Sequence, residues 1–173
     1  MNRIVGFAAI GFLTGLLETY LVRGDDETWF LLLGILFGLP VAMLLWFQGL
    51  SLFRVLALIA GFAASWRAAY WCASNIGARI HEEIGEPATY TLSGVVGGFV
   101  GAVILVLTFR LLLGKARSAS AMQLVSLGGA IFGAVLIEAA YLAEATYLFI
   151  IWQTVVGALL GWAWPTPEAA HRG

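Results

Sequence analysis

The stretch that decides the fold runs from Thr91 to Leu113 and reads TLSGVVGGFVGAVILVLTFRLLL. Its one charged residue, Arg110, lies close to its C-terminal end. The hydrocarbon core of a bilayer is about 30 Å thick, and about 20 consecutive apolar residues of helix are needed to cross it. Lipid offers no hydrogen-bond partners, so a spanning segment must pair its own backbone groups as a helix. The stretch therefore predicts a transmembrane helix.

The composition extends this prediction to the whole chain. Hydrophobic residues make up 61% of the sequence and charged residues 11%, and the mean hydropathy is +0.94. A typical soluble domain is about 45–50% apolar and about 25% charged. In water, a short chain with this composition would leave much apolar surface exposed, because small domains bury only about 70% of their unfolded surface. The net charge of −1 also excludes the basic field that nucleic-acid binding needs, so we expect no nucleic-acid partner.

Further apolar stretches of similar length follow one another along the chain, separated by short polar breaks. With Thr91–Leu113 they make six: Arg3–Val22, Trp29–Phe47, Phe53–Ala73, Thr91–Leu113, Met122–Ala143 and Tyr147–Trp164. The first stretch resembles a signal peptide, but it is longer than the apolar part of a typical signal peptide and no small-residue cleavage pattern follows it. We expect it to be a retained helix. We therefore expect one all-α domain over residues 1–173, a multi-pass membrane bundle of six transmembrane helices.

The basic residues indicate how the bundle is oriented. One side carries Arg3, Arg54, Arg110, Lys115, Arg117 and Arg172, and the other carries Arg23 and Arg79. Lys and Arg accumulate in cytoplasmic loops, so both termini are predicted to be cytoplasmic. An odd number of spans would place residues of both sets on each side of the membrane, so the distribution of charge also favours six spans. We expect the inner (cytoplasmic) membrane of a bacterium.

The longest connection, residues 75–90, lies on the outer side between the third and fourth spans. Ile80 and Ile84 are one helical turn apart within it, which predicts a short helix lying in the membrane interface. Gly85 and Pro87 are expected to end this helix.

Small residues recur four apart in every span. The pairs are Gly11/Gly15, Gly34/Gly38, Gly61/Ser65, Gly97/Gly101, Gly129/Gly133 and Gly157/Gly161. Such pairs let helix backbones approach closely, which predicts tight packing in lipid. The sequence leaves open whether some of these faces meet other membrane subunits instead.

The odd-numbered spans share a pattern near their outer ends. A charged residue is followed shortly by a tyrosine: Glu18 and Tyr20, Arg67 and Tyr70, Glu138 and Tyr141. The next span then starts with threonine and an aromatic residue: Thr28-Trp29, Thr89-Tyr90 and Thr146-Tyr147. This pattern favours three copies of one two-helix hairpin with approximate three-fold pseudosymmetry. The alternative is convergence, because aromatic residues favour interfaces in any membrane protein.

The charged residues of this pattern define the candidate site. At 1.5 Å of rise per residue, Glu18, Arg67 and Glu138 lie roughly 6–9 Å inside the outer ends of their helices. Lipid exposure of a charge is unfavourable, so we expect them to face one another, with Arg67 bridging both carboxylates. Tyr20, Tyr70 and Tyr141 are expected to complete a polar network; Gln153, the one amide in the bilayer core, is expected to bond to Trp152 or a neighbouring helix.

Three interpretations of this cluster stay open. It can be a substrate-binding or ion-binding site for a cation, a proton or the amine of a zwitterion. It can also be a salt-bridge clasp that fixes helix packing, or a set of side chains that snorkel to the interface.

Sequence motifs for catalysis or cofactor binding are absent. There is no Gly-x-Ser-x-Gly elbow, no His-Glu-x-x-His pair and no phosphate loop. The single cysteine, Cys72, excludes an internal disulfide, and no histidine lies in a span to bind zinc or haem. We therefore expect no enzyme, catalytic residue, metal or cofactor.

Two functions remain. The first is a small transport or channel protein, or a membrane-embedded solute-binding subunit. In size, number of spans and cytoplasmic termini the chain resembles the substrate-binding subunits of energy-coupling-factor importers, although no motif carries that resemblance. The alternative is a non-catalytic accessory or assembly subunit of a larger membrane complex.

Overall fold

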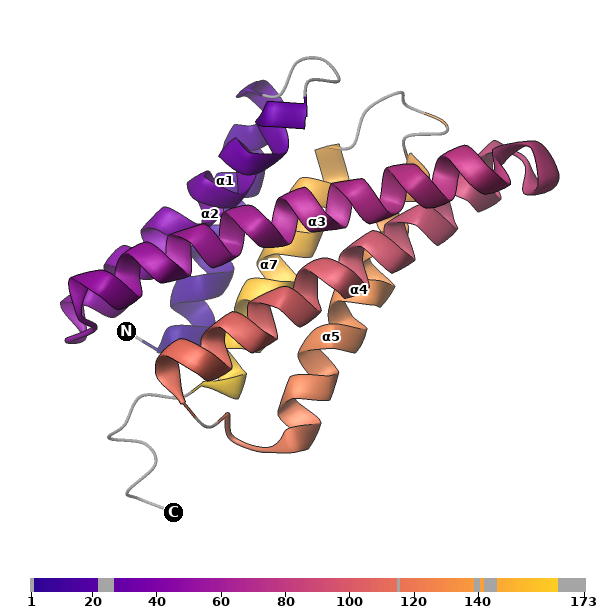
Figure 1. Cartoon of the computed structure of the whole chain (residues 1–173). Coiled ribbons are helices and arrows are strands. Elements are labelled where there is room, and N and C mark those ends of the chain that lie inside the picture. The colour runs from indigo at the N-terminus through magenta and orange to yellow at the C-terminus, as the bar shows by residue number, and fades with distance from the viewer. Residues whose placement is uncertain (1, 22–26, 115, 139–140, 142–145, 165–173) are drawn as a thin grey trace.

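The protein is a bundle of helices in a computed structural model that describes residues 2–21, 27–114, 116–138, 141 and 146–164 (Figure 1). No strand occurs in these residues. The elements are α1 (Arg3–Leu21), α2 (Glu27–Phe47), α3 (Leu52–Ile84), α4 (Glu86–Leu113), α5 (Ala119–Gly133), the 3₁₀ helix η1 (Ala134–Glu138) and α7 (Thr146–Ala163). Six helical segments, with α5 and η1 taken together, are long and apolar enough to cross a membrane. The predicted all-α architecture with six such helices is confirmed.

The hairpin of α3 and α4 is longer than the sequence predicted. These helices have 33 and 28 residues, which makes them about 50 and 42 Å long at 1.5 Å per residue. The expected separate interfacial helix is wrong, because α3 runs without a break to Ile84 and α4 starts at Glu86. Gly85 alone makes the turn, with a φ of 76° that favours glycine. Pro87 begins α4 instead of ending α3, since the first turn of a helix needs no N–H group there.

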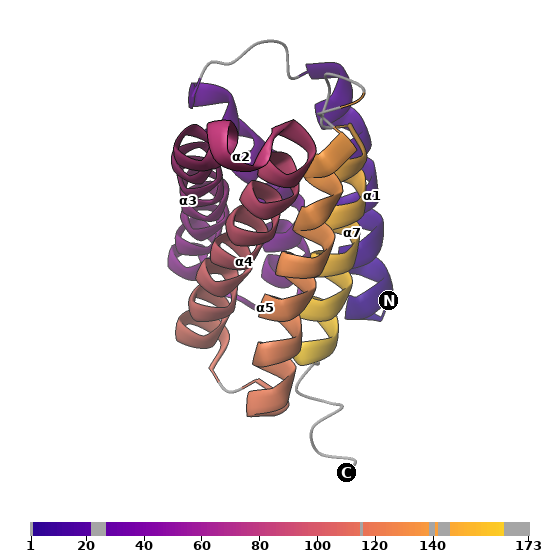
Figure 2. The ribbon, with the colours of Figure 1, turned by 90° about the vertical axis from the view of Figure 1, so that its right-hand side faces the viewer.

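The six helices form a closed ring in which each packs on the next along the chain, and α7 packs on α1 (Figures 1 and 2). The contacts of α1 with α7, α2 with α3, α3 with α4 and α4 with α5 are extensive, whereas α1 touches α2 at few positions. The three hairpins therefore differ in packing as well as in length. The internal repeat and its three-fold pseudosymmetry stay predictions.

Aromatic rings fill the middle of this ring of helices. Phe7, Phe37, Phe62 and Phe109 come from α1, α2, α3 and α4, and each is at most 1% exposed. Phe109 meets Phe7 and Phe62 edge to face, with ring centroids 6.1 Å apart in both pairs, and Phe37 meets Phe62 at 4.9 Å. Edge-to-face contacts of this kind add to the energy of burial. At this level the bundle has a packed core.

Glycines bring α1 and α7 into backbone contact. A Cβ atom added at Gly15 would lie 2.6 Å from the carbonyl oxygen of Phe149 on α7. Added at Gly157 on α7, it would lie equally close to the carbonyl oxygen of Phe7 on α1. Gly11 and Gly161 face the partner backbone in the same way. We call this contact the α1–α7 seam.

The remaining small-residue pairs also face neighbouring helices of the same chain. Gly94 and Gly98 on α4 lie against Gly133 and Gly129 on α5, so that glycine meets glycine. The pair on α2 faces α3, and the pair on α3 faces α4. The Ser65 hydroxyl of α3 donates a hydrogen bond of 2.8 Å to the carbonyl of Gly101 on α4. The prediction of tight packing is thus confirmed, and these faces are occupied within the bundle.

At the end of the bundle opposite Gly85, polar contacts tie four segments together. Arg3 donates to the side chain of Gln48 at 2.7 Å and to the carbonyl oxygen of Trp164 at 2.9 Å. The Trp164 indole donates to the carbonyl of Gly114 at 3.2 Å. The start of α1, the turn after α2 and the ends of α4 and α7 are thereby joined. A cation at the C-terminal end of α7 is also favourable for the helix dipole.

A methyl group on the α1–α7 seam tests the close approach. We expect Gly15→Ala to lower the free energy of unfolding by about 1–3 kcal/mol, because the added atom meets backbone that cannot rotate away. Thermal unfolding of the protein in mild detergent measures this effect. Gly77→Ala is the matched control, since its Cβ would meet mainly the hydroxyl of Ser93 at 3.2 Å, which can turn. Equal stability of the two variants would contradict the seam.

Candidate functional site

Glu18 lies on the α1–α7 seam and is completely buried. Its Oε2 accepts a hydrogen bond from the side-chain amide of Gln153 on α7. The Thr14 hydroxyl lies 2.7 Å from the Gln153 carbonyl oxygen, to which it donates. Thr14 and Gln153 are buried as well. Together these three side chains form the Glu18–Gln153–Thr14 cluster, which joins the two helices through polar atoms.

Helix geometry and glycine explain why these side chains meet. Thr14 and Glu18 are four residues apart, so they lie on one face of α1, one turn from each other. Gly11 and Gly15 lie on the same seam, and Gly11 faces the backbone of Gln153 itself. The glycines allow α7 to approach so closely that the short polar side chains reach across.

The second carboxylate oxygen of Glu18 shapes the chemistry of the cluster. Oε1 is buried, and no residue in the described part of the chain gives it a hydrogen bond. An ionised carboxylate held by one neutral amide is expensive in apolar surroundings. The cheaper state of the cluster is one in which a positive species accompanies the carboxylate, either a proton or a small cation.

Glu138 has a different role at the N-terminal end of α7. It is the last residue of η1 and is 8% exposed, and its Oε1 accepts a hydrogen bond of 2.8 Å from the backbone N–H of Leu148. Leu148 belongs to the first turn of α7, where backbone N–H groups have no partner within the helix. A carboxylate is favourable at this positive end of the helix dipole. Glu138 therefore caps α7 from a neighbouring element.

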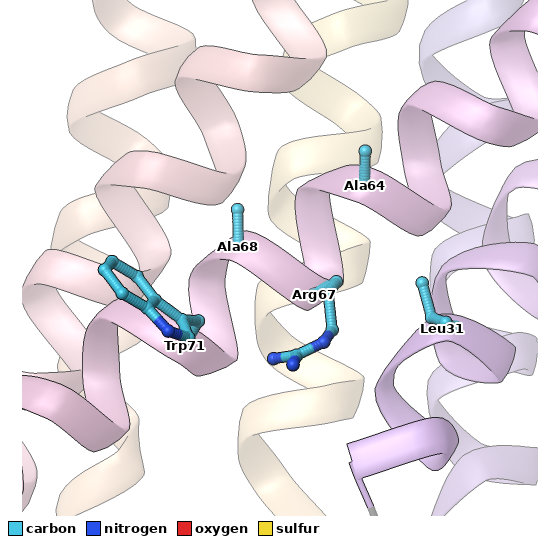
Figure 3. Close-up of a pocket in the computed structure, with 5 residues that line it drawn as sticks. All are labelled: Leu31, Ala64, Arg67, Ala68 and Trp71. Carbon is cyan, nitrogen blue, oxygen red and sulfur yellow. The ribbon is translucent and has the colours of Figure 1, made fainter.

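Arg67 lies on α3, outside the α1–α7 seam. It lines an open pocket of about 440 Å³ between α2 and α3, together with Leu31, Ala64, Ala68 and Trp71 (Figure 3). The carboxylate of Glu18 is held by Gln153 and not by Arg67 in the described residues. Of the predicted bridge from Arg67 to both carboxylates, the half that joins Arg67 to Glu18 therefore does not form in the described residues.

The three tyrosines do not surround the cluster. Tyr20 and Tyr141 are each 71% exposed, on the outer surface of the bundle. Two residues of helix turn the side chain by about 200°, so Tyr20 must leave the face that carries Glu18. Tyr70 stacks on Phe30 of α2, with ring centroids 3.8 Å apart. Its ring therefore contributes to packing between α2 and α3.

Sequence reasoning missed the pairing of Glu18 with Gln153. Two signals were available: the spacing of Thr14 and Glu18, and the position of Gln153, the one amide predicted to lie in the bilayer core. Gln153 was expected to bond either to Trp152 or to a neighbouring helix, and it bonds to Glu18 of the neighbouring helix α1. The Trp152 indole donates instead to the carbonyl of Gly129, at 3.1 Å. The sequence did not say which helix that neighbour is.

The capping role of Glu138 makes a stability prediction. We expect Glu138→Ala to lower the free energy of unfolding by about 1 kcal/mol, as for the loss of other N-terminal caps. Glu138→Gln keeps an acceptor oxygen, so its free energy of unfolding should fall by less. Thermal unfolding of the two variants in mild detergent makes the comparison. If Glu138→Ala unfolds at the same temperature as the wild type, the carboxylate does not cap α7.

Comparisons with known proteins add no assignment to this geometry. No protein-family model, curated protein or solved structure matches the chain. The function is therefore argued from the residues and their contacts.

Proposed function

We propose that this chain is a small membrane transport protein in which Glu18 carries a proton or a small monovalent cation through the bundle interior. The single observation behind the proposal is the buried Oε1 of Glu18, to which no described residue donates. Ionisable groups inside membrane bundles commonly mark ion and proton pathways, because their burial is costly. A purely structural role would be served at lower cost by an apolar pair.

The surroundings of Glu18 support a small ligand. Backbone meets backbone one turn to either side of Gln153 on α7, where Gly15 faces Phe149 and Gly157 faces Phe7, so the seam at Gln153 leaves no room for an organic solute. A divalent-metal site of the usual kind needs several ligands, and no group of three His, Cys, Asp or Glu side chains occurs in the described residues. A proton fits this restriction best, since it needs no cavity.

Thr14 and Gln153 can follow a change of charge on Glu18. The Thr14 hydroxyl has two acceptors within reach, the Gln153 carbonyl oxygen at 2.7 Å and the backbone oxygen of Ile10 at 2.8 Å. It can therefore release Gln153 without losing its own hydrogen bond. The amide is then free to adjust as Glu18 gains or loses its proton.

The proposed orientation gives this site an entrance. We place both termini in the cytoplasm and the bundle in a bacterial inner membrane, on the distribution of basic residues alone. Glu18 is three residues from the end of α1 at Leu21, about 4.5 Å along the axis. A proton would then enter from the outer side over this last turn of α1.

One observation favours the alternative, a non-catalytic accessory subunit. The rings of Phe7, Phe37, Phe62 and Phe109 close the middle of the bundle, so no straight path follows its axis. In this case Glu18 and Gln153 are a clasp that fixes α7 on α1. Other membrane subunits would then meet the outer faces of the helices.

Proton flux separates the two functions. The purified protein is reconstituted in liposomes that contain a pH-sensitive dye, and a potassium diffusion potential drives protons inward. We expect flux above that of protein-free liposomes, and a loss of about tenfold or more in Glu18→Gln, in line with the contribution of a positioned proton-transfer group. The external buffer contains choline and little potassium; replacing choline by sodium leaves the potential in place and shows whether a cation accompanies or replaces the proton.

Glu86→Gln is the matched control, because Glu86 is an exposed glutamate in the first turn of α4. It should conduct like the wild type. A folded Glu18→Gln protein with unchanged flux would overturn the proposal. Wild-type flux no greater than that of empty liposomes would do the same and leave the accessory role.

A further inference from the structure

The pocket between α2 and α3 combines an apolar groove with one cation. Ala64 and Ala68 line it on α3 with small side chains. Leu31 borders it from α2, and Trp71, 58% exposed, borders it further along α3. Figure 3 shows the guanidinium of Arg67 between the labelled side chains of Trp71 and Leu31. The hollow has a volume of about 440 Å³ and is open to the outside of the bundle.

We propose that this pocket binds one anionic phospholipid, with its phosphate on Arg67 and an acyl chain along Ala64 and Ala68. The guanidinium offers a planar fork of donors that matches a phosphate in two parallel hydrogen bonds. Arg67 already has an interaction within the chain. Its five N–H donors leave capacity for a ligand beside that interaction.

The depth of the pocket suits a lipid headgroup. Leu31 lies four residues from the start of α2 at Glu27, about 6 Å along the helix axis. Trp71 lies one turn beyond Arg67 in the direction of Gly85, and tryptophan prefers the level of the headgroups. The long arginine side chain reaches towards that level while its stem stays among apolar groups.

The lining argues for a bilayer lipid as the occupant. Leu31 is 41% exposed and Trp71 is 58% exposed on the outside of the bundle, so in a membrane the pocket opens sideways into the bilayer. A lipid reaches it by lateral diffusion and supplies both an apolar chain and a negative charge. The negative charge of the headgroup complements the guanidinium. A zwitterionic headgroup binds less well, because its own cationic group competes with Arg67 for the phosphate.

Lipid retention tests this site directly. The protein is reconstituted in vesicles of phosphatidylcholine and phosphatidylglycerol at a molar ratio of about three to one, in which both lipids are accessible to the bundle. After extraction in mild detergent, native mass spectrometry counts the phospholipids that stay bound. We expect enrichment of phosphatidylglycerol, and a loss of about tenfold of that enrichment in Arg67→Gln, the scale of a charge-assisted hydrogen bond.

Two further variants make the result specific. Ala64→Trp fills the groove without removing the charge and should also reduce the bound phosphatidylglycerol. Arg54→Gln is the matched control, since Arg54 is an exposed arginine of the same helix, and it should retain the wild-type enrichment. Unchanged enrichment in Arg67→Gln would overturn the proposal, as would an equal loss in Arg54→Gln. A protein partner that co-purifies through Arg67 in place of lipid would overturn it as well.

Discussion

The direct backbone contact between α1 and α7 is the constraint on which the site depends. In lipid the hydrophobic effect gives helices no reason to associate, so close packing and interhelical hydrogen bonds have to hold them together. Gly15, Gly157 and Gly161 supply the close packing, each facing a carbonyl group of the other helix. Gln153 supplies the hydrogen bond to Glu18. Glycine at the seam and polar atoms within it are therefore two parts of one arrangement.

The charged residues do different work at different places in the bundle. Glu138 caps the N-terminal end of α7, and Arg3 binds a carbonyl group at its C-terminal end. Both placements follow the polarity of the helix dipole. Glu18 is not explained by a helix end, because it is buried on the seam and bonds to Gln153 of the other helix. That difference is why we assign the proposed proton to Glu18 and a structural role to Glu138.

The sequence predicted the architecture well because long apolar helices obey strong and simple constraints. Apolar length predicted the six helices, and glycine spacing predicted that they pack closely. Helix ends were harder: residues 75–84 contain no proline and Gly77 does not end the helix, so α3 continues where a separate interfacial helix was expected. Contacts between helices were hardest, because depth along a helix says nothing about the direction in which a side chain points. Glu18 and Arg67 share a predicted depth, yet they face different neighbours.

The most direct measurement is the distance between the side chains of Glu18 and Gln153 in a bilayer. Solid-state NMR on protein in lipid, with ¹³C-labelled glutamate and with ¹⁵N-labelled glutamine and arginine, detects carbon–nitrogen pairs at hydrogen-bond range. The structure predicts a cross-peak between the Glu18 carboxyl carbon and the Gln153 amide nitrogen, which disappears in Gln153→Leu. Absence of that cross-peak, with contact between the Glu18 carboxyl group and the Arg67 guanidinium in its place, would contradict the α1–α7 seam.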